Sequence, residues 1–216
     1  MIRLGRPKKG EEILRRDQLL EHAVRLFAEY GYSGLSLETI AREARVSLRT
    51  IYRQFGGKGE LFGAAIRHYS DLFVATLPLE QARAKPFEEI LVDFAREFLF
   101  RLTRPDMVRL RTQMMAEMHR FPGLAAEFYS QGPERTLHRL AQFFALYQKS
   151  GAVADVDADF LAGQFVNCLR GERFQRLQLG LEETPDEREI ELWARRAVGL
   201  FLRGCLSPST AVPVDG

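Results

Sequence analysis

Apolar residues recur at steps of three and four along almost the whole of this 216-residue chain. Side chains at that spacing share one face of an α-helix, so each such stretch predicts an amphipathic helix. No segment alternates apolar and polar residues as a half-buried β-strand does. We therefore expect an all-α protein with about nine helices.

The first predicted helix runs from about Ile13 to Tyr30. Gly31 is its expected stop, because glycine tolerates the left-handed backbone that commonly follows a helix. The spacing places on its inner face Leu19, Leu20, Ala23, Leu26, Phe27 and Tyr30.

Two serines mark the starts of the next two helices. Ser36 and Ser47 are expected to accept hydrogen bonds from the first free backbone N–H groups. Gly56-Gly57 should end the third helix, and a fourth should begin near Lys58. Further helices are expected over residues 87–103, 106–120, a stretch ending near residue 151, 159–179 and 187–204.

The last of these helices has a sequence signature for its start. Thr184 and Glu187 have the spacing of a capping box, in which two side chains satisfy two backbone donors reciprocally. Pro185 between them suits the first helical position. We predict that the helix begins there and ends at Gly204.

The composition argues against several classes of protein. No apolar run approaches the roughly 18–20 residues that a bilayer span needs, and the first thirty residues lack the apolar core of a signal peptide. The four histidines are scattered, the two cysteines are too few for a zinc site, and no nucleophile or phosphate-loop motif occurs. We expect a cytoplasmic protein that is not an enzyme and uses no metal or cofactor.

The net charge of +2 conceals an asymmetry. Residues 1–58 contain twelve basic and seven acidic side chains, whereas the remainder is mildly acidic. We call residues 1–58 the head and the remainder the body. A basic head followed by an acidic body favours a polyanionic partner for the head, although an ordinary distribution of surface charge gives the same numbers of basic and acidic residues.

The segment from Leu37 to Phe55 reads as a helix-turn-helix. Ala41 is small enough for two helices to cross, Val46 fills the turn, and Ile51 anchors the second helix. The outer face of that second helix is then free to enter the DNA major groove. It carries Leu48, Arg49, Thr50, Tyr52 and Arg53. The alternative at this point is a helical hairpin with a solvated face.

The stretch LEHAVRLFAEYGYSGLSLETIAREARVSLRTIYRQFGGKGELF resembles the DNA-binding domain of TetR-family transcriptional regulators. The likeness covers roughly residues 13–65. The segment FPGLAAEFYSQGPERTL at 121–137 is similar to the AefR-like branch of that family. The resemblance implies a three-helix helix-turn-helix domain (13–60) after a basic arm (1–12), then a helical effector-binding and dimerisation domain (61–205) and a flexible tail (206–216).

The resemblance also implies roles for individual residues. Thr50, Tyr52 and Lys58 are expected to contact DNA phosphates, while Arg49 and Leu48 are the candidates for base contacts. The complete predicted DNA-binding set is Arg6, Lys8, Ser36, Thr39, Ser47, Leu48, Arg49, Thr50, Tyr52, Arg53 and Lys58.

Two residues depart from the family pattern. Arg45 stands at the turn position where glycine is usual, and a left-handed backbone there costs a non-glycine residue about 1–2 kcal/mol. Gly57 stands where a serine usually caps the fourth helix. Either change could alter the detailed geometry of the helix-turn-helix.

The N-terminal arm contains Gly5-Arg6-Pro7-Lys8-Lys9, which resembles the core of an AT-hook. An arginine on an extended backbone can enter a narrow minor groove, where the negative potential is strongest. The alternative is a basic tail that binds any phosphate.

The body is rich in Phe and Met and could enclose a small lipophilic effector. The predicted pocket residues are Phe98, Met114, Met118, Phe128, Phe144, Tyr147, Asn167 and Arg170. A palindromic operator needs two recognition helices, so we expect a homodimer on double-stranded DNA. The predicted interface residues are Leu161, Phe165, Trp193, Ala197, Leu200 and Phe201. The expected function is a repressor released by its effector; the alternative is a regulator whose body binds a protein partner.

Overall fold

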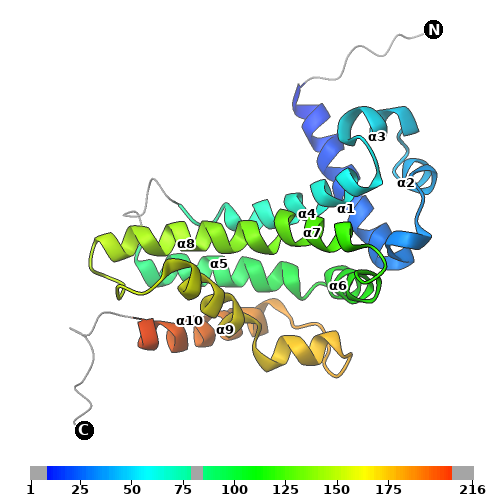
Figure 1. Cartoon of the computed structure of the whole chain (residues 1–216). Helices are drawn as coiled ribbons and strands as arrows, with labels where there is room; N and C mark the ends of the chain where they lie inside the picture. Colours follow the sequence, from blue (N-terminus) through cyan, green and yellow to red (C-terminus); the bar gives the residue numbers. More distant parts are fainter. Residues whose placement is uncertain (1–8, 79–84, 206–216) are drawn as a thin grey trace, which may run out of the picture. The chain divides into compact units, whose positions relative to one another are not determined.

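The computed structural model describes residues 9–78 and 85–205, and every regular element in this part of the chain is a helix (Figure 1). The predicted all-α fold is therefore confirmed. The ten helices are α1 (Lys9–Gly34), α2 (Leu37–Glu43), α3 (Leu48–Phe55), α4 (Lys58–Val74), α5 (Phe87–Leu102), α6 (Pro105–Glu117), α7 (Pro122–Gln131), α8 (Pro133–Lys149), α9 (Ala158–Gln178) and α10 (Glu187–Cys205).

The chain divides into two compact units. Of the described residues, the first unit contains 9–68 and 109–131, and the second contains 69–78, 85–108 and 132–205. The helix-turn-helix thus shares its unit with the end of α6 and all of α7, which the sequence prediction had placed in the second domain. The predicted functional boundaries at residues 12, 60 and 205 stay predictions.

Aromatic rings form the centre of the first unit. The Phe62 ring lies edge-on to Phe27 at a centroid distance of 5.1 Å, and Tyr32 stacks on Phe27 at 5.9 Å. Phe121 and Phe128, from the segment around α7, contact Tyr32 and Phe62 respectively. These ring contacts join α1, α4 and α7 within the first unit.

One residue predicted for this core lies outside it. Tyr30 is 51% exposed, whereas Val24 and Ala28, which the prediction omitted, are buried. The prediction for Tyr30 was wrong: its side chain is exposed although the next residue of α1, Gly31, is buried. Gly31, immediately beyond, has φ 71° and interrupts the helical backbone, which confirms its expected role as a stop.

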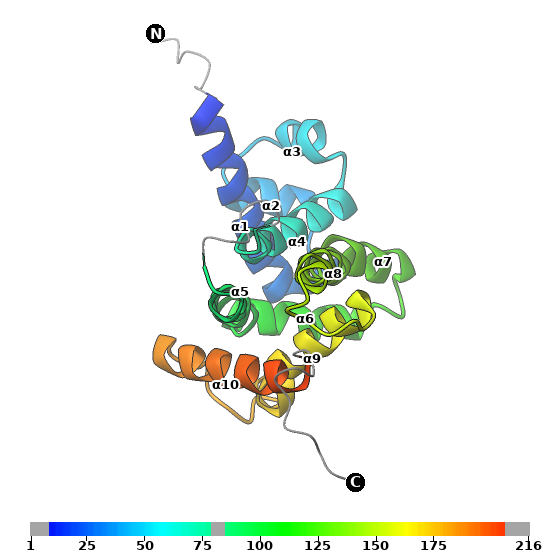
Figure 2. The same cartoon turned by 90° about the vertical axis from the view of Figure 1, so that its left-hand side faces the viewer.

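The second unit is built around a different set of phenylalanines. Phe94 stacks on Phe98 at 5.6 Å, and Phe144 meets Phe165 edge-on at 5.9 Å. In this unit α8 packs on α9, and α10 packs on both α5 and α9 (Figures 1 and 2). Among the described residues no helix is long and apolar enough to cross a membrane.

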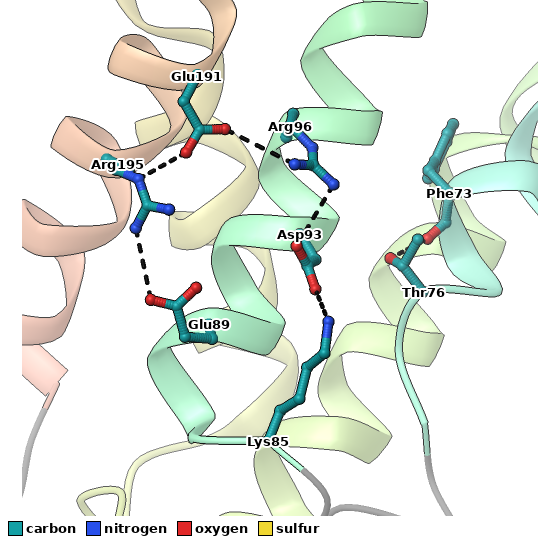
Figure 3. Close-up of polar contacts among 8 residues, drawn as sticks. All are labelled: Phe73, Thr76, Lys85, Glu89, Asp93, Arg96, Glu191 and Arg195. Carbon is teal, nitrogen blue, oxygen red and sulfur yellow. Dashed lines mark hydrogen bonds and ion pairs between the residues drawn. The ribbon is translucent and has the colours of Figure 1, made fainter.

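A row of alternating charges joins α5 to α10 on the surface of the second unit. Figure 3 shows Glu89 facing Arg195 at 3.5 Å, and Arg195 bound to Glu191 at 2.6 Å. The row continues through Arg96 to Asp93, which also binds Lys85 at 2.7 Å. Partly exposed pairs such as these contribute little one at a time, and the contact between the two helices also includes buried apolar residues such as Ile90 and Ala194.

Two predictions for the last helices were wrong in detail. The capping box of α10 is two residues later than expected: Asp186 Oδ1 accepts from the Glu189 N–H at 2.8 Å, and Glu189 Oε2 accepts from the Asp186 N–H at 2.9 Å. Helix α9 is interrupted at Gly171, whose φ of 52° and ψ of −166° are open almost only to glycine.

Candidate nucleic-acid interface

The helix-turn-helix is held together by three small or branched apolar residues. Ile51 is fully buried and Ala41 is nearly so, which fits their predicted places at the crossing of α2 and α3. Val46 is half-buried in the turn. These contacts turn the opposite face of α3 toward solvent.

The turn from α2 to α3 is a Schellman motif. The Val46 N–H donates to the Ala41 carbonyl at 2.9 Å, and the Arg45 N–H donates to the Arg42 carbonyl at 3.2 Å. This pair of bonds places the intervening residue in the left-handed region. Arg45 does lie there, with φ 54°. The turn therefore has the left-handed residue at the position where the family usually has glycine, and the free-energy cost of that conformation arises from an arginine.

Two predicted serine caps are present. Ser36 Oγ accepts from the Thr39 N–H at 3.1 Å, and Ser47 Oγ accepts from the Thr50 N–H at 3.0 Å. The hydroxyls of Ser47 and Thr50 also lie 2.7 Å apart. Each cap satisfies a backbone donor at a helix start, so the beginning of α3 is fixed and can still offer hydroxyl groups to a ligand.

The outward face of α3 carries mostly polar and cationic groups. Arg49, Tyr52 and Arg53 are exposed, while Leu48 and Thr50 are half-buried at its edge. Gln54 is also exposed on this helix. The sequence prediction omitted Gln54, although a position four residues after Thr50 belongs to the same face of a helix.

Lys58, at the start of α4, interacts with an aromatic ring in this structure. Its Nζ lies 4.5 Å from the centroid of Tyr32, within the range of a cation–π interaction. Burial lowers the pKa of Lys58, and the nearby Glu117 carboxylate acts against that shift. Gly57 has no side chain with which to cap α4, and its carbonyl accepts the first backbone bond of the helix, from the Leu61 N–H at 3.0 Å.

Glu117 links the end of α6 to the segment that precedes α2. Its Oε2 accepts from the Ser33 N–H at 2.8 Å, and a Cβ on Gly31 would collide with its Oε1. No sequence signal could have found this contact, because 84 residues separate the two partners. Arg6 and Lys8, the predicted contacts of the arm, lie outside the described residues.

Comparison with known proteins decides the family. Residues 89–204 match the family model for the C-terminal domain of AefR-like transcriptional repressors, and residues 19–65 match that of bacterial regulatory proteins of the tetR family. The first match alone covers more than half of the chain. The chain belongs to the TetR family of bacterial transcriptional regulators. The resemblance stated from the sequence is thereby confirmed.

Individual TetR-family proteins show how far the likeness extends. The HTH-type transcriptional regulator TcmR of Streptomyces glaucescens is 32% identical over 149 residues, which are 67% of this chain and 63% of TcmR. The match therefore spans less than two thirds of that relative's length. The flavonoid-responsive regulator FrrA, a solved structure, is 33% identical with a TM-score of 0.66, covering 89% of this chain and 97% of FrrA. A TetR regulator from Agrobacterium tumefaciens shares the fold, with a TM-score of 0.67 at 23% identity over 89% of this chain and 95% of that one.

The predicted effector-pocket residues of this TetR-family chain are distributed over both compact units. Met114, Met118 and Phe128 belong to the first unit, and the others belong to the second. Within the second unit Phe98 and Phe144 are buried, Tyr147 and Arg170 are half-buried, and Asn167 is exposed. The pocket stays a prediction.

The predicted interface residues also differ in exposure. Leu161, Phe165 and Ala197 are buried in the core of their own protomer, and Trp193 and Phe201 are half-buried against it. Leu200 is 67% exposed. Two exposed apolar residues that the prediction omitted, Phe160 and Leu192, lie on the same helices as this set. Phe165 has no exposed surface with which to contact a partner, since its ring packs between Phe144 and Phe201.

Proposed function

We propose that this chain is a dimeric repressor that binds a palindromic operator through α3 of each protomer. A small lipophilic effector would bind the body and release the protein from DNA. The observation that carries the DNA-binding part is the buried anchoring of α3 by Ile51, which leaves Arg49, Tyr52 and Arg53 exposed. Guanidinium, phenol and hydroxyl groups are suited to base edges and phosphates.

Charge supports DNA as the ligand of this face. From Leu37 to Lys58 the chain has five basic and two acidic residues. Among the described residues, Arg42 is the one of these five cations that forms an ion pair, at 3.3 Å from Glu43, and Lys58 lies over the ring of Tyr32. Arg45, Arg49 and Arg53 are exposed and form no ion pair in the described part of the chain, so they are available for phosphates, whose neutralisation releases counterions from DNA.

Exposed apolar residues support a dimer through α9 and α10. Phe160 on α9 and Leu192 and Leu200 on α10 are all at least half exposed. Leu192 and Leu200 are eight residues apart and therefore share one face of α10. Large apolar groups gathered on one surface indicate a protein contact, and two copies of this surface would give the twofold arrangement that a palindromic site requires.

A lipophilic effector is supported by a relative. FrrA is a flavonoid-responsive regulator, and the body of this chain contains many phenylalanines, among them Phe94, Phe98, Phe144 and Phe165. We propose an aromatic or otherwise lipophilic small molecule. The effector acts by binding more tightly to the conformation in which the distance between the two DNA-binding heads does not match the spacing of the operator half-sites.

The proposal is tested by selecting DNA from a random pool with the purified protein and then adding candidate effectors. We expect an enriched inverted repeat, and release of that DNA by a lipophilic compound that also raises the melting temperature of the protein. If no sequence is enriched, the proposed DNA-binding function is refuted. Enrichment without release by flavonoids or other lipophilic compounds would favour regulation by a protein partner.

A further inference from the structure

Arg45 adopts a backbone conformation that its residue type disfavours. Its φ of 54° lies in the left-handed region, and among the described residues it is the one non-glycine residue with a positive φ. Glycine reaches this region without a steric penalty, which is why it usually follows a helix that ends in a Schellman motif. The turn between α2 and α3 therefore holds an arginine where glycine would fit better.

The conformation is imposed by the surroundings and not by the arginine. The bonds from Val46 to Ala41 and from Arg45 to Arg42 use backbone atoms alone. The Ser47 cap then fixes the start of α3. Glycine at position 45 could make the same backbone bonds. Strained residues of this kind gather at functional sites, where the side chain has a use that offsets the strain.

The Arg45 side chain is free to bind a ligand. It is exposed, and within residues 9–78 and 85–205 no acidic group forms an ion pair with it. The nearest acidic residue in sequence, Glu43, is paired with Arg42 instead. A guanidinium can donate two parallel hydrogen bonds to a phosphate.

We propose that Arg45 binds a backbone phosphate of the operator, beside the bases that α3 reads. The proposal rests on the DNA-binding function argued above. Arg45 precedes Leu48, the first residue of α3, by three positions and belongs to the turn. A helix in the major groove is bordered by the two phosphate strands, so a cation that precedes it reaches the border of the groove and not its floor.

Arg45→Gly separates a DNA contact from a structural role because the two predict opposite changes. The variant should melt at or above the wild-type temperature, since the left-handed strain is relieved. It should nevertheless bind the selected operator about tenfold more weakly, as expected for one charged hydrogen-bonded contact. The loss should be equal on random DNA, and the slope of log K against log salt should fall in magnitude by about one.

Two control variants complete the experiment. Arg45→Lys keeps the charge and the strain but loses the two parallel hydrogen bonds of a guanidinium, so its salt slope should stay that of the wild type while its operator affinity should lie between those of the wild type and Arg45→Gly. Arg120→Ala removes another exposed arginine of the same unit, in the connection between α6 and α7, and should leave the salt slope unchanged.

Wild-type affinity and slope in Arg45→Gly would overturn the proposal while leaving the DNA-binding function intact. A loss confined to one base position would also overturn it, because Arg45 would then read a base. A wild-type protein that selects no DNA would overturn both the proposal and the function on which it rests.

Discussion

Gly31→Ala should destabilise the unit that holds the helix-turn-helix, for two separate reasons. Gly31 has φ 71° and ψ 171°, a region that glycine alone reaches easily, and a strained residue of this kind costs about 1–3 kcal/mol. The new methyl group would also collide with Glu117 Oε1. Displacing that carboxylate breaks its 2.8 Å bond from the Ser33 N–H.

The second contribution can be estimated. A hydrogen bond to a charged group contributes about 1.5–3 kcal/mol, and the lower end applies because Ser33 is exposed. Both contributions together give a loss of about 2–5 kcal/mol in the free energy of unfolding. This is a large part of the total for an ordinary domain, which is about 5–15 kcal/mol.

A double-mutant cycle with Glu117→Ala separates the two contributions. In the Glu117→Ala background the methyl group meets no carboxylate, so Gly31→Ala should cost the backbone strain alone. The combined loss should then be smaller than the sum of the single losses by about 1–2 kcal/mol. The assay is urea unfolding followed by circular dichroism, at one fixed protein concentration because a dimer's stability depends on it.

Gly34→Ala is the matched control for this cycle. Gly34 lies in the same helix without a positive φ, and a Cβ there meets nothing within 4 Å, so its substitution should be neutral or stabilising. Additive losses for Gly31→Ala and Glu117→Ala would show that no contact couples them. A neutral Gly31→Ala would refute the backbone argument as well.

Three further changes have defined outcomes. Ser47→Ala removes the acceptor of the 3.0 Å bond from the Thr50 N–H and should lower the free energy of unfolding by about 1 kcal/mol, whereas Ser47→Gly should lower it by only a few tenths. Leu200→Asp should give a monomer with weak operator binding in size-exclusion chromatography with light scattering, and a stable dimer would place the interface elsewhere. Deletion of residues 1–8 should abolish a preference for A·T pairs beside the operator; a loss that is uniform and salt-sensitive would mean a non-specific basic tail.

Phe201 is less suitable than Leu200 as a probe of the dimer. Its ring lies 4.9 Å from Phe165 and 5.7 Å from Phe144, so Phe201→Asp would place a charge against the core of the protomer. Failure to dimerise could then reflect failure to fold.

The sequence predicted those features that depend on neighbouring residues. Ser36 and Ser47 cap their helices as expected because a cap needs only the residue itself and the N–H three positions later. The family pattern, in which glycine is usual at position 45, pointed to a left-handed residue there, and Arg45 has φ 54°; whether the arginine would alter the turn was left open by the sequence. The start of α4 near Lys58 was likewise predicted from the Gly56-Gly57 pair that precedes it.

Features that depend on distant packing could not be predicted. Tyr30 follows the apolar spacing of α1 but is exposed, which the spacing within a single helix does not reveal. Phe165 is a large apolar residue of the kind that interfaces contain, yet neighbouring rings bury it within its own chain. The bond from Ser33 to Glu117 joins segments whose proximity arises only when α6 folds against the first helices of its unit.

The role of α3 is tested most directly by the base preference of Arg49→Ala, measured by fluorescence anisotropy on the selected operator and on every single-base variant of it. Arg49 is exposed on that helix, so we predict a loss of about 1–3 kcal/mol on the operator, with relaxed discrimination at one base position. Unchanged binding would contradict DNA reading by this face of α3. An equal loss on every sequence would contradict a base contact and make Arg49 a phosphate ligand.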